Sequence, residues 1–396
     1  MTERLPAAFL LGSDFAADPY AQYAALREAG AVHPIDFPPG VPAFLIVDHE
    51  HGRAALNDPR LSKNPDHSGV RVPYEAFFGG TLLGVDPPDH TRLRGLVAKA
   101  FTPRRIEALR PRIQEVADGL LDDVAGREEV DLITAFAFPL PIIVICELLG
   151  VPAGDRADFR AWTATLTALD LSAEQRERRR DTARAFNAYL REIFAERRET
   201  PGDDLISALV AARDGDSLLT DAELLNAILL LLIAGHETTV NLIGNGVHAL
   251  LRAPAQLRLL RERPDLLPAA IEELLRFDSP VERASQRIAV QDVEIAGTVI
   301  PRGSWVHVSL GAAHRDPRAF HEPDALDITR PDNRHLAFGH GIHYCLGAPL
   351  ARVEGQIAIG TLLTRFPTLR LATDHDLPWT QTGSIVRGLT TLPVHL

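Results

Sequence analysis

The segment of residues 220–251 constrains the fold of this chain more than any other part of the sequence. It contains the run LLLLIAGHETTVNLIGNG, whose length and composition predict a helix that is apolar on all sides. Such a helix is normally buried through the middle of a protein, so other elements must surround it. The longest apolar runs, around 228–234 and 142–146, are shorter than the ~20 residues that span a membrane. We therefore expect a globular protein built around this helix.

Helical patterns dominate the rest of the chain, which has 396 residues. The segments 32–37 and 43–47 have the composition of a short strand pair, 286–300 alternates like a hairpin and 305–310 like a strand. A sheet made from them would join the two ends of the sequence. We predict a mainly α protein with a minor β-sheet region, folded as a single domain over residues 1–396. The expected helices are 19–30, 49–57, 89–100, 103–125, 138–149, 155–169, 173–198, 203–213, 220–251, 254–262, 266–277 and 348–366.

The charge balance and the cysteine count exclude several classes of protein. The net charge is 41 − 53 = −12, which does not favour binding of nucleic acid. The two cysteines, Cys146 and Cys345, are too few for a disulfide framework, and the N-terminus lacks the basic-then-apolar pattern of a secretion signal. We expect a cytoplasmic monomer that binds neither nucleic acid nor a membrane.

Residues 338–352, FGHGIHYCLGAPLAR, place a cysteine between a glycine-rich loop and the start of a helix. A helix N-terminus offers unpaired N–H groups and the positive end of the helix dipole, which favour the thiolate form of Cys345. Gly339, Gly341 and Gly347 would let the backbone approach a flat ligand closely. The pattern indicates that Cys345 supplies an anionic sulfur ligand to a metal or a haem.

The residues alone leave a zinc site open in the same loop, because His340, His343 and Cys345 have a suitable spacing. No second Cys/His pair in the sequence completes such a site. Cys146, inside the run PIIVICELLG, has the surroundings of an ordinary buried cysteine, and we interpret it as part of the core.

The cysteine loop resembles the haem-binding loop of the cytochrome P-450 family, Phe-x-x-Gly-x-(Arg/His)-x-Cys-x-Gly. Phe338, Gly341, His343, Cys345 and Gly347 match its specified positions. The resemblance covers essentially the whole chain and implies the P-450 fold. It also implies haem b as the cofactor, with Cys345 as the axial ligand of the iron, the rest of the loop (including Gly339) against the haem, and dioxygen as co-substrate.

Ala234, Gly235, Glu237, Thr238 and Thr239 resemble the oxygen-activating motif of the same family, Ala/Gly-Gly-x-Asp/Glu-Thr-Thr. A lone helical threonine commonly bonds the carbonyl one turn back, but burying a carboxylate beside two threonines is costly. The resemblance implies that Thr238 hydrogen-bonds dioxygen at the haem and that Glu237 relays the protons that cleavage of the O–O bond requires. It also implies that Ala234 and Gly235 lie over the haem, where Gly235 leaves space for dioxygen.

Glu273 and Arg276 are three residues apart on the expected helix 266–277 and share one of its faces. An exposed ion pair is the ordinary interpretation of this spacing. In the P-450 family the same ExxR spacing forms a buried network with an arginine from the coil before the haem loop, and the resemblance assigns that position to Arg330. The coil departs from the family pattern at 325–326, where an aromatic residue is more common.

A haem carries two propionates and therefore requires cationic donors. The stretch DPPDHTRLR resembles the helix that contacts them in the family, and its His90 and Arg94, four residues apart, share a face. Arg287 and His343 match two further propionate contacts. Each residue alone could be an exposed charge, but the resemblance assigns all four to the propionates, a role that suits arginine because it bonds carboxylates in a bidentate manner.

The resemblance is to soluble bacterial family members that act on macrolides, other polyketides and steroid-like molecules. It implies a monooxygenase that hydroxylates a bulky lipophilic molecule. Epoxidation, phenol coupling and peroxide-driven oxidation are alternative outcomes, and a non-catalytic homologue that stabilises a partner enzyme is another, against which Cys345 argues. The candidate substrate-pocket residues, each of which could equally belong to the core, are Phe77, Phe78, Leu82, Leu83, Ile233, Val281, Ala284, Ile385 and Val386.

The sequence contains no flavin or iron–sulfur motif. We therefore expect electrons from a separate ferredoxin or flavodoxin and its NAD(P)H-dependent reductase, so that NAD(P)H serves only indirectly. These carriers are usually acidic, and docking would need a local basic face on this acidic protein. Lys99, Arg104, Arg105 and Arg352 are the candidate docking residues.

Overall fold

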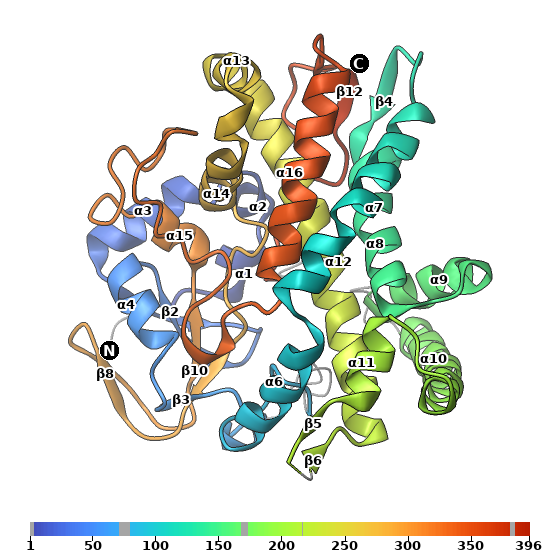
Figure 1. Ribbon diagram of the computed structural model, residues 1–396. Coiled ribbons are helices and arrows are strands. Elements are labelled where there is room, and N and C mark those ends of the chain that lie inside the picture. The colour runs from blue at the N-terminus through green and yellow to red at the C-terminus, as the bar shows by residue number, and fades with distance from the viewer. Residues whose placement is uncertain (1–3, 71–79, 168–172, 216, 381–384) are drawn as a thin grey trace.

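The protein is mainly helical in the computed structural model, with a small sheet region beside the helices (Figure 1), as the sequence predicts. The structure describes residues 4–70, 80–167, 173–215, 217–380 and 385–396. Its longer helices are α3 (Tyr20–Ala29), α6 (Asp89–Ala100), α7 (Pro103–Asp122), α8 (Pro139–Leu149), α9 (Arg156–Thr167), α10 (Ala173–Glu199), α12 (Asp221–Arg252), α13 (Pro254–Glu262), α14 (Leu267–Phe277) and α16 (Ala348–Arg365). Its shorter helices are α1 (Ala7–Leu11), α2 (Ser13–Ala17), α4 (His49–Ala55), α11 (Leu205–Ala211) and α15 (Leu310–His314).

The long apolar helix α12 begins at a capping box. Thr220 Oγ1 accepts the N–H of Glu223 at 3.2 Å, and the Glu223 carboxylate accepts the N–H of Thr220 at 2.8 Å. Among the described residues, α12 is the one helix long and apolar enough to cross a membrane, yet 56% of its most apolar stretch is buried inside the protein. α8, α14 and α16 pack against it, so protein covers its apolar surface.

The sheets join segments that are distant in sequence. A five-stranded sheet has the order β1-β2-β10-β7-β3, with β2 and β10 parallel, and a three-stranded sheet has the order β11-β12-β4. Strands near the N-terminus therefore pair with a strand that follows α14. The strands are β1 (Val32–Asp36), β2 (Pro42–Ile46), β3 (Leu61–Ser62), β4 (Glu129–Asp131), β5 (Arg213–Asp214), β6 (Ser217–Leu218), β7 (Arg287–Ala289), β8 (Val293–Ile295), β9 (Thr298–Ile300), β10 (Trp305–Val308), β11 (Arg370–Leu371) and β12 (Pro393–His395).

The single hairpin expected over 286–300 is wrong in its first part. β7 belongs to the five-stranded sheet, where it pairs with β10 and β3, and only β8 and β9 form the hairpin. Ala296 and Gly297 make the turn with φ values of 50° and 76°, as a two-residue hairpin turn requires. This arrangement anchors Arg287 in the main sheet next to β3.

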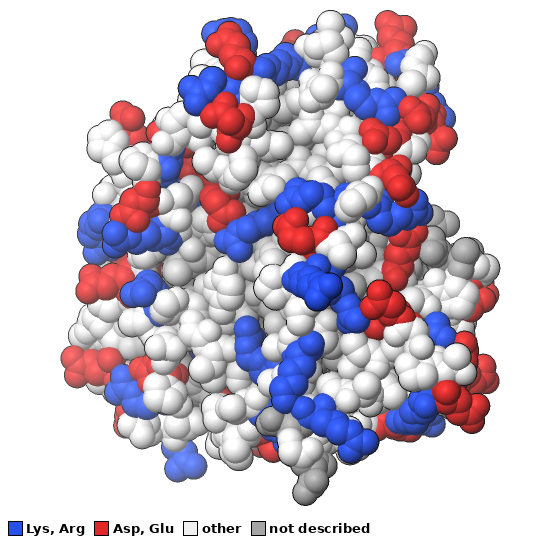
Figure 2. Space-filling model, viewed as in Figure 1, with Lys and Arg blue, Asp and Glu red and all other residues white. Residues whose placement is uncertain are grey.

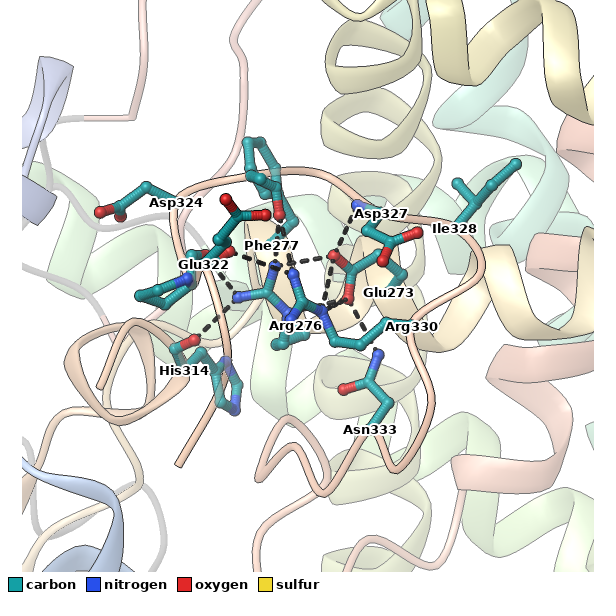
Figure 3. A network of polar contacts seen from close by, with 12 residues as sticks. Glu273, Arg276, Phe277, His314, Glu322, Asp324, Asp327, Ile328, Arg330 and Asn333 are labelled. Carbon is teal, nitrogen blue, oxygen red and sulfur yellow. Dashed lines mark hydrogen bonds and ion pairs between the residues drawn. The ribbon is translucent and has the colours of Figure 1, made fainter. Parts of the chain in front are cut away.

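A buried carboxylate on α14, that of Glu273, organises the coil before the cysteine loop (Figure 3). Arg276 donates Nη2 to Glu273 Oε1 at 2.7 Å and Nε to Oε2 at 2.8 Å. From the coil, Arg330 Nε and Asn333 Nδ2 each donate to Oε2 at 3.0 Å, and the N–H of Asp327 donates to Oε1 at 2.9 Å. Because the side chains of Glu273 and Arg276 are 1% and 0% exposed, water does not screen this network.

Arg276 uses every N–H of its guanidinium. Besides bonding Glu273, Nη1 donates to the carbonyls of His314 at 2.9 Å and Pro323 at 2.7 Å, and Nη2 donates to that of Ala325 at 3.0 Å. Ala325 contributes only its backbone oxygen, so its small side chain does not weaken the network. These hydrogen bonds connect α14 to the end of α15 and to the coil that leads to the cysteine loop.

Replacing Arg276 with alanine should strongly destabilise the protein. The change leaves the Glu273 carboxylate buried with one guanidinium instead of two, and breaking a buried charge network costs about 3–5 kcal/mol. Urea unfolding followed by circular dichroism measures the loss. The control is Arg263→Ala, because Arg263 pairs with Asp265 where their side chains are 59% and 63% exposed, and such pairs contribute about 0–1 kcal/mol. Equal unfolding midpoints for the two variants would contradict this role.

Candidate active site

A cavity of about 290 Å³ lies between α12 and the cysteine loop. Its wall is mostly apolar, which is usual for a small-molecule site. The lining residues of α12 recur every three or four positions, so they lie on one face of that helix. They are Ala227, Leu230, Leu231, Ala234, Gly235, Thr238, Thr239 and Leu242, and the cysteine loop contributes Phe338, Gly339, His340, His343, Tyr344, Cys345, Leu346 and Gly347.

Cys345 is exposed because it forms part of the cavity wall. Its N–H donates to the carbonyl of Phe338 at 2.8 Å. Burial within the molecule raises the pKa of the Cys345 thiol, while the N–H groups of Gly347 and Ala348 and the charge of Arg94 lower it. The start of α16 thus acts in the direction expected from the sequence but does not outweigh burial. A bound metal cation would complete the stabilisation of the thiolate.

Two glycines of the loop adopt backbone conformations that favour glycine. Gly339 and Gly341 have φ values of 73° and 76°. At Gly341 a Cβ would also lie 2.4 Å from Asn57 Oδ1, which leaves no room for a side chain. Gly347 differs, because its φ is −79° and its Cβ would lie 3.8 Å from Cys345 Sγ. The shape of the loop therefore requires glycine at 339 and 341.

Three buried nitrogen atoms near one wall of the cavity have no hydrogen-bond partner among the described residues. They are His90 Nε2 on α6, Arg287 Nε on β7 and His343 Nε2 in the cysteine loop. The rings of His90 and His343 have centroids 4.2 Å apart. Burial, and then the charges of Lys63 and His90, lower the pKa of His343 to about 2. Because buried polar atoms are nearly always paired, this wall fits an anionic group such as a carboxylate.

Arg94 and Arg287 hold their guanidiniums at the cavity through backbone carbonyls. Arg94 Nη2 donates to Tyr344 at 2.7 Å, and Arg287 Nη2 and Nη1 donate to Leu56 at 2.7 Å and Leu61 at 3.3 Å. Burial lowers the pKa of Arg287 to about 10. With one thiol, a cationic wall and a mostly apolar remainder, the donor set fits a haem. Among the described residues, no group of three or more His, Cys, Asp and Glu could hold a metal ion, so the zinc alternative gains no support.

The hydroxyls of α12 bond the preceding turn of that helix. Thr238 Oγ1 donates to the carbonyl of Ala234 at 2.7 Å, and Thr239 Oγ1 donates to that of Gly235 at 3.2 Å. Both hydroxyl oxygens can still accept a hydrogen bond. Glu237 is half-buried and is not part of the cavity wall, and burial raises the pKa of its carboxyl.

Two buried titratable residues of the wall, Lys63 and Glu354, are absent from the sequence-based predictions. Glu354 on α16 is 1% exposed, and burial raises the pKa of its carboxyl to about 8, against the effect of the Thr239 hydroxyl. The sequence feature that could have identified Glu354 is that it is the lone carboxylate in an apolar helix. Lys63 is 7% exposed. The sequence feature that could have identified Lys63 is that it is one of two lysines in a chain with 41 − 2 = 39 arginines.

Two predicted pocket residues, Ile233 and Val386, are not among the residues that line this cavity. Ile233 falls between the positions of α12 that recur along its lining face. Val386 follows Ile385 in an extended segment, where successive side chains point to opposite sides. Phe77 and Phe78 lie outside the described residues. The wall contains the remaining predicted residues, Leu82, Leu83, Val281, Ala284 and Ile385.

Comparison with known proteins shows which sequences and structures this chain is similar to. The family model described as Cytochrome P450 matches residues 159–391. The "Cytochrome P450 monooxygenase PikC" of Streptomyces venezuelae is 48% identical, with 97% of this chain and 92% of that protein covered. The "Vitamin D(3) 25-hydroxylase" of Pseudonocardia autotrophica is 46% identical, with 97% and 95% covered. The solved structure of the "Bacillaene Polyketide Synthase (PKS) Cytochrome P450 PksS" of Bacillus subtilis 168 has a TM-score of 0.92 at 41% identity, with 98% and 99% covered.

Proposed function

Because this chain belongs to the cytochrome P450 family and is a haem-thiolate monooxygenase, we propose that it hydroxylates a macrolide, another polyketide or a steroid-like molecule. The observation that carries the proposal is the cavity beside Cys345, to which α12 presents apolar side chains and two hydroxyls. A lipophilic substrate gains free energy when it leaves water for such a wall. The proposal includes a single domain over residues 1–396, soluble and monomeric in the cytoplasm.

Bound haem supplies the redox chemistry that activates dioxygen, and its thiolate ligand favours cleavage of the O–O bond. Cys345 would hold the iron. His90, Arg94, Arg287 and His343 would bind the two carboxylates. This role is supported by the unpaired nitrogen atoms of His90, Arg287 and His343 and by the guanidinium charges of Arg94 and Arg287. The apolar residues of α12 and the cysteine loop would exclude water from the two faces of the ring.

Thr238 and Glu237 would handle protons on the α12 side of the cavity. The Thr238 hydroxyl donates to Ala234, so its oxygen is free to accept a hydrogen bond, and rotation of the hydroxyl would let it donate into the cavity. Burial raises the pKa of Glu237, so its carboxyl keeps a proton at a higher pH than an exposed glutamate does. A carboxyl whose pKa is raised in this way is suited to resupply a proton to the hydroxyl.

Replacing Thr238 with alanine should uncouple electron consumption from product formation. Without a positioned hydroxyl, proton delivery loses a factor of about 10² or more, so product per electron falls and hydrogen peroxide release rises. NADPH consumption, product and peroxide are measured together with surrogate redox partners. Thr364→Ala is the matched control, because Thr364 Oγ1 also donates to the carbonyl four residues back, that of Gly360 at 2.8 Å, but is exposed. Unchanged coupling in Thr238→Ala would refute the role.

The substrate class is tested by the absorption spectrum of the haem. A ferrous–carbon monoxide complex with a strongly red-shifted Soret band should first establish thiolate ligation. Titration with a macrolactone, a steroid, a straight-chain fatty acid and a charged dipeptide should then convert the iron from low to high spin for the first two at the lowest concentrations. A response to the dipeptide alone would contradict the proposed substrate class.

Electrons would come from a ferredoxin or flavodoxin, reduced in turn by an NAD(P)H-dependent reductase, that docks on the face bearing the cysteine loop. Lys and Arg gather over the middle of this face, around α6 and the start of α16 (Figure 2). Lys99 and Arg104 are exposed there, as are the apolar side chains of Ile342 and Tyr344. Of the other two predicted docking residues, Arg352 forms an ion pair with Glu272 at 2.7 Å and Arg105 one with Asp203 at 3.4 Å. Lys99 Nζ donates to the carbonyl of Arg213 at 2.7 Å.

Reversing both exposed charges, with Lys99→Glu and Arg104→Glu together, should slow reduction by an acidic ferredoxin several-fold at low salt, because rim charges chiefly govern association. The effect should shrink as ionic strength rises. Stopped-flow reduction under carbon monoxide measures the rate. Arg302→Glu on an exposed loop, together with Arg370→Glu on β11, gives the same change in net charge as a control. Equal rates for the two double variants would argue against docking on this face.

A further inference from the structure

Lys63 is a buried cation in the cavity wall, and it forms no ion pair with any described residue. Its Nζ donates to Ser285 Oγ at 2.6 Å, to the Ser285 carbonyl at 3.1 Å and to the Gln286 carbonyl at 2.9 Å. These acceptors use all three N–H groups of the ammonium, but none of them carries a charge. A buried charge without a counter-charge is unfavourable, so this arrangement is incomplete by itself.

The carboxylate that acts on Lys63 from the protein, that of Asp86, is bonded elsewhere. One Asp86 oxygen accepts the backbone N–H of Lys63 at 2.9 Å, and the other accepts the Ser62 hydroxyl. Asp86 raises the pKa of the ammonium only partly. Burial first, and then the charge of Arg287, hold the pKa of Lys63 well below its usual range.

The same wall contains other positive or unpaired groups. Arg287 and His343 line the cavity with Lys63, and each has a buried nitrogen without a partner among the described residues. The charge of Arg287 lowers the pKa of Lys63, so the two cations of this wall repel one another when the cavity holds no anion. A ligand with two carboxylates would turn this repulsion into attraction.

We propose that Lys63 is a positioning residue for the cofactor, a buried positive charge that is balanced only when the haem carboxylates lie against this wall. The proposal rests on the haem function proposed above. Lysine differs here from the 39 arginines of the chain, because it can release its proton from an empty site and arginine cannot. Lys63 thus lets the protein fold without a second unpaired buried charge beside Arg287, and still provides that charge when the cofactor binds.

The test compares the holoenzyme with Lys63→Gln, which keeps an N–H donor for Ser285 and Gln286 but loses the charge, and with Lys63→Arg, which keeps the charge. Removing the charge should lower the ferric-to-ferrous equilibrium constant about tenfold, a shift of about 59 mV toward negative potential. Transfer of haem to excess apomyoglobin should become about tenfold faster. Lys63→Arg should restore both values. Lys99→Gln, at the exposed second lysine, should change neither.

Potentials and haem-transfer rates that are the same in Lys63→Gln and Lys99→Gln would overturn the proposal. So would failure of Lys63→Arg to restore them in a protein with a wild-type melting temperature, because the role would then be structural. A wild type that lacks the thiolate carbon monoxide spectrum would instead refute the proposed haem function itself.

If Lys63→Gln does not fold, the pH dependence of the ferric-to-ferrous reduction potential tests the proposal instead. The groups that act on Lys63 are Asp86, Arg287, His343 and His307. The wild-type potential should fall with rising pH as Lys63 loses its proton, and that step should be missing in Lys63→Arg. Parallel curves for these two proteins would overturn the proposal.

Discussion

The apolar surface of α12 has to be covered on every side, and the positions of the other helices follow from that requirement. α8, α14 and α16 supply the cover. Because α16 starts directly after the cysteine loop, packing α16 against α12 brings Cys345 to the same cavity as Thr238. α14 carries Glu273, whose network holds the coil that leads into that loop. The site is therefore a consequence of how one apolar helix is enclosed.

The sequence predicts those parts of the fold that depend on local signals. α6 and α13 have the bounds that periodicity and prolines predict, and α12 begins one residue after the expected position. The separation of β7 from the hairpin could not be predicted, because it depends on pairing with a strand far away in the sequence. Ile233 shows a related limit. Since α12 is apolar all round, its sequence does not indicate which face meets the cavity.

The functional site likewise has residues that the sequence predicts and residues that it does not. Cys345, His343 and Thr238 belong to contiguous motifs, and the resemblance that these motifs carry led to them directly. Lys63 and Glu354 belong to no motif, and their burial arises only from tertiary packing. A charged residue in a loop or on a helix is exposed by default, so nothing local separates a buried Lys63 from an exposed Lys99.

Two of the buried charge centres among the described residues show opposite solutions to one problem. Around Glu273, two guanidiniums, an amide and a backbone N–H satisfy a single carboxylate, and Arg276 has no free N–H. Around Lys63 and Arg287, the positive charges meet neutral carbonyls, and nitrogen atoms remain unpaired. The first centre is complete without a cofactor and can hold the coil in place beforehand, whereas the second is completed by the ligand, whose binding free energy then adds to the stability of that wall.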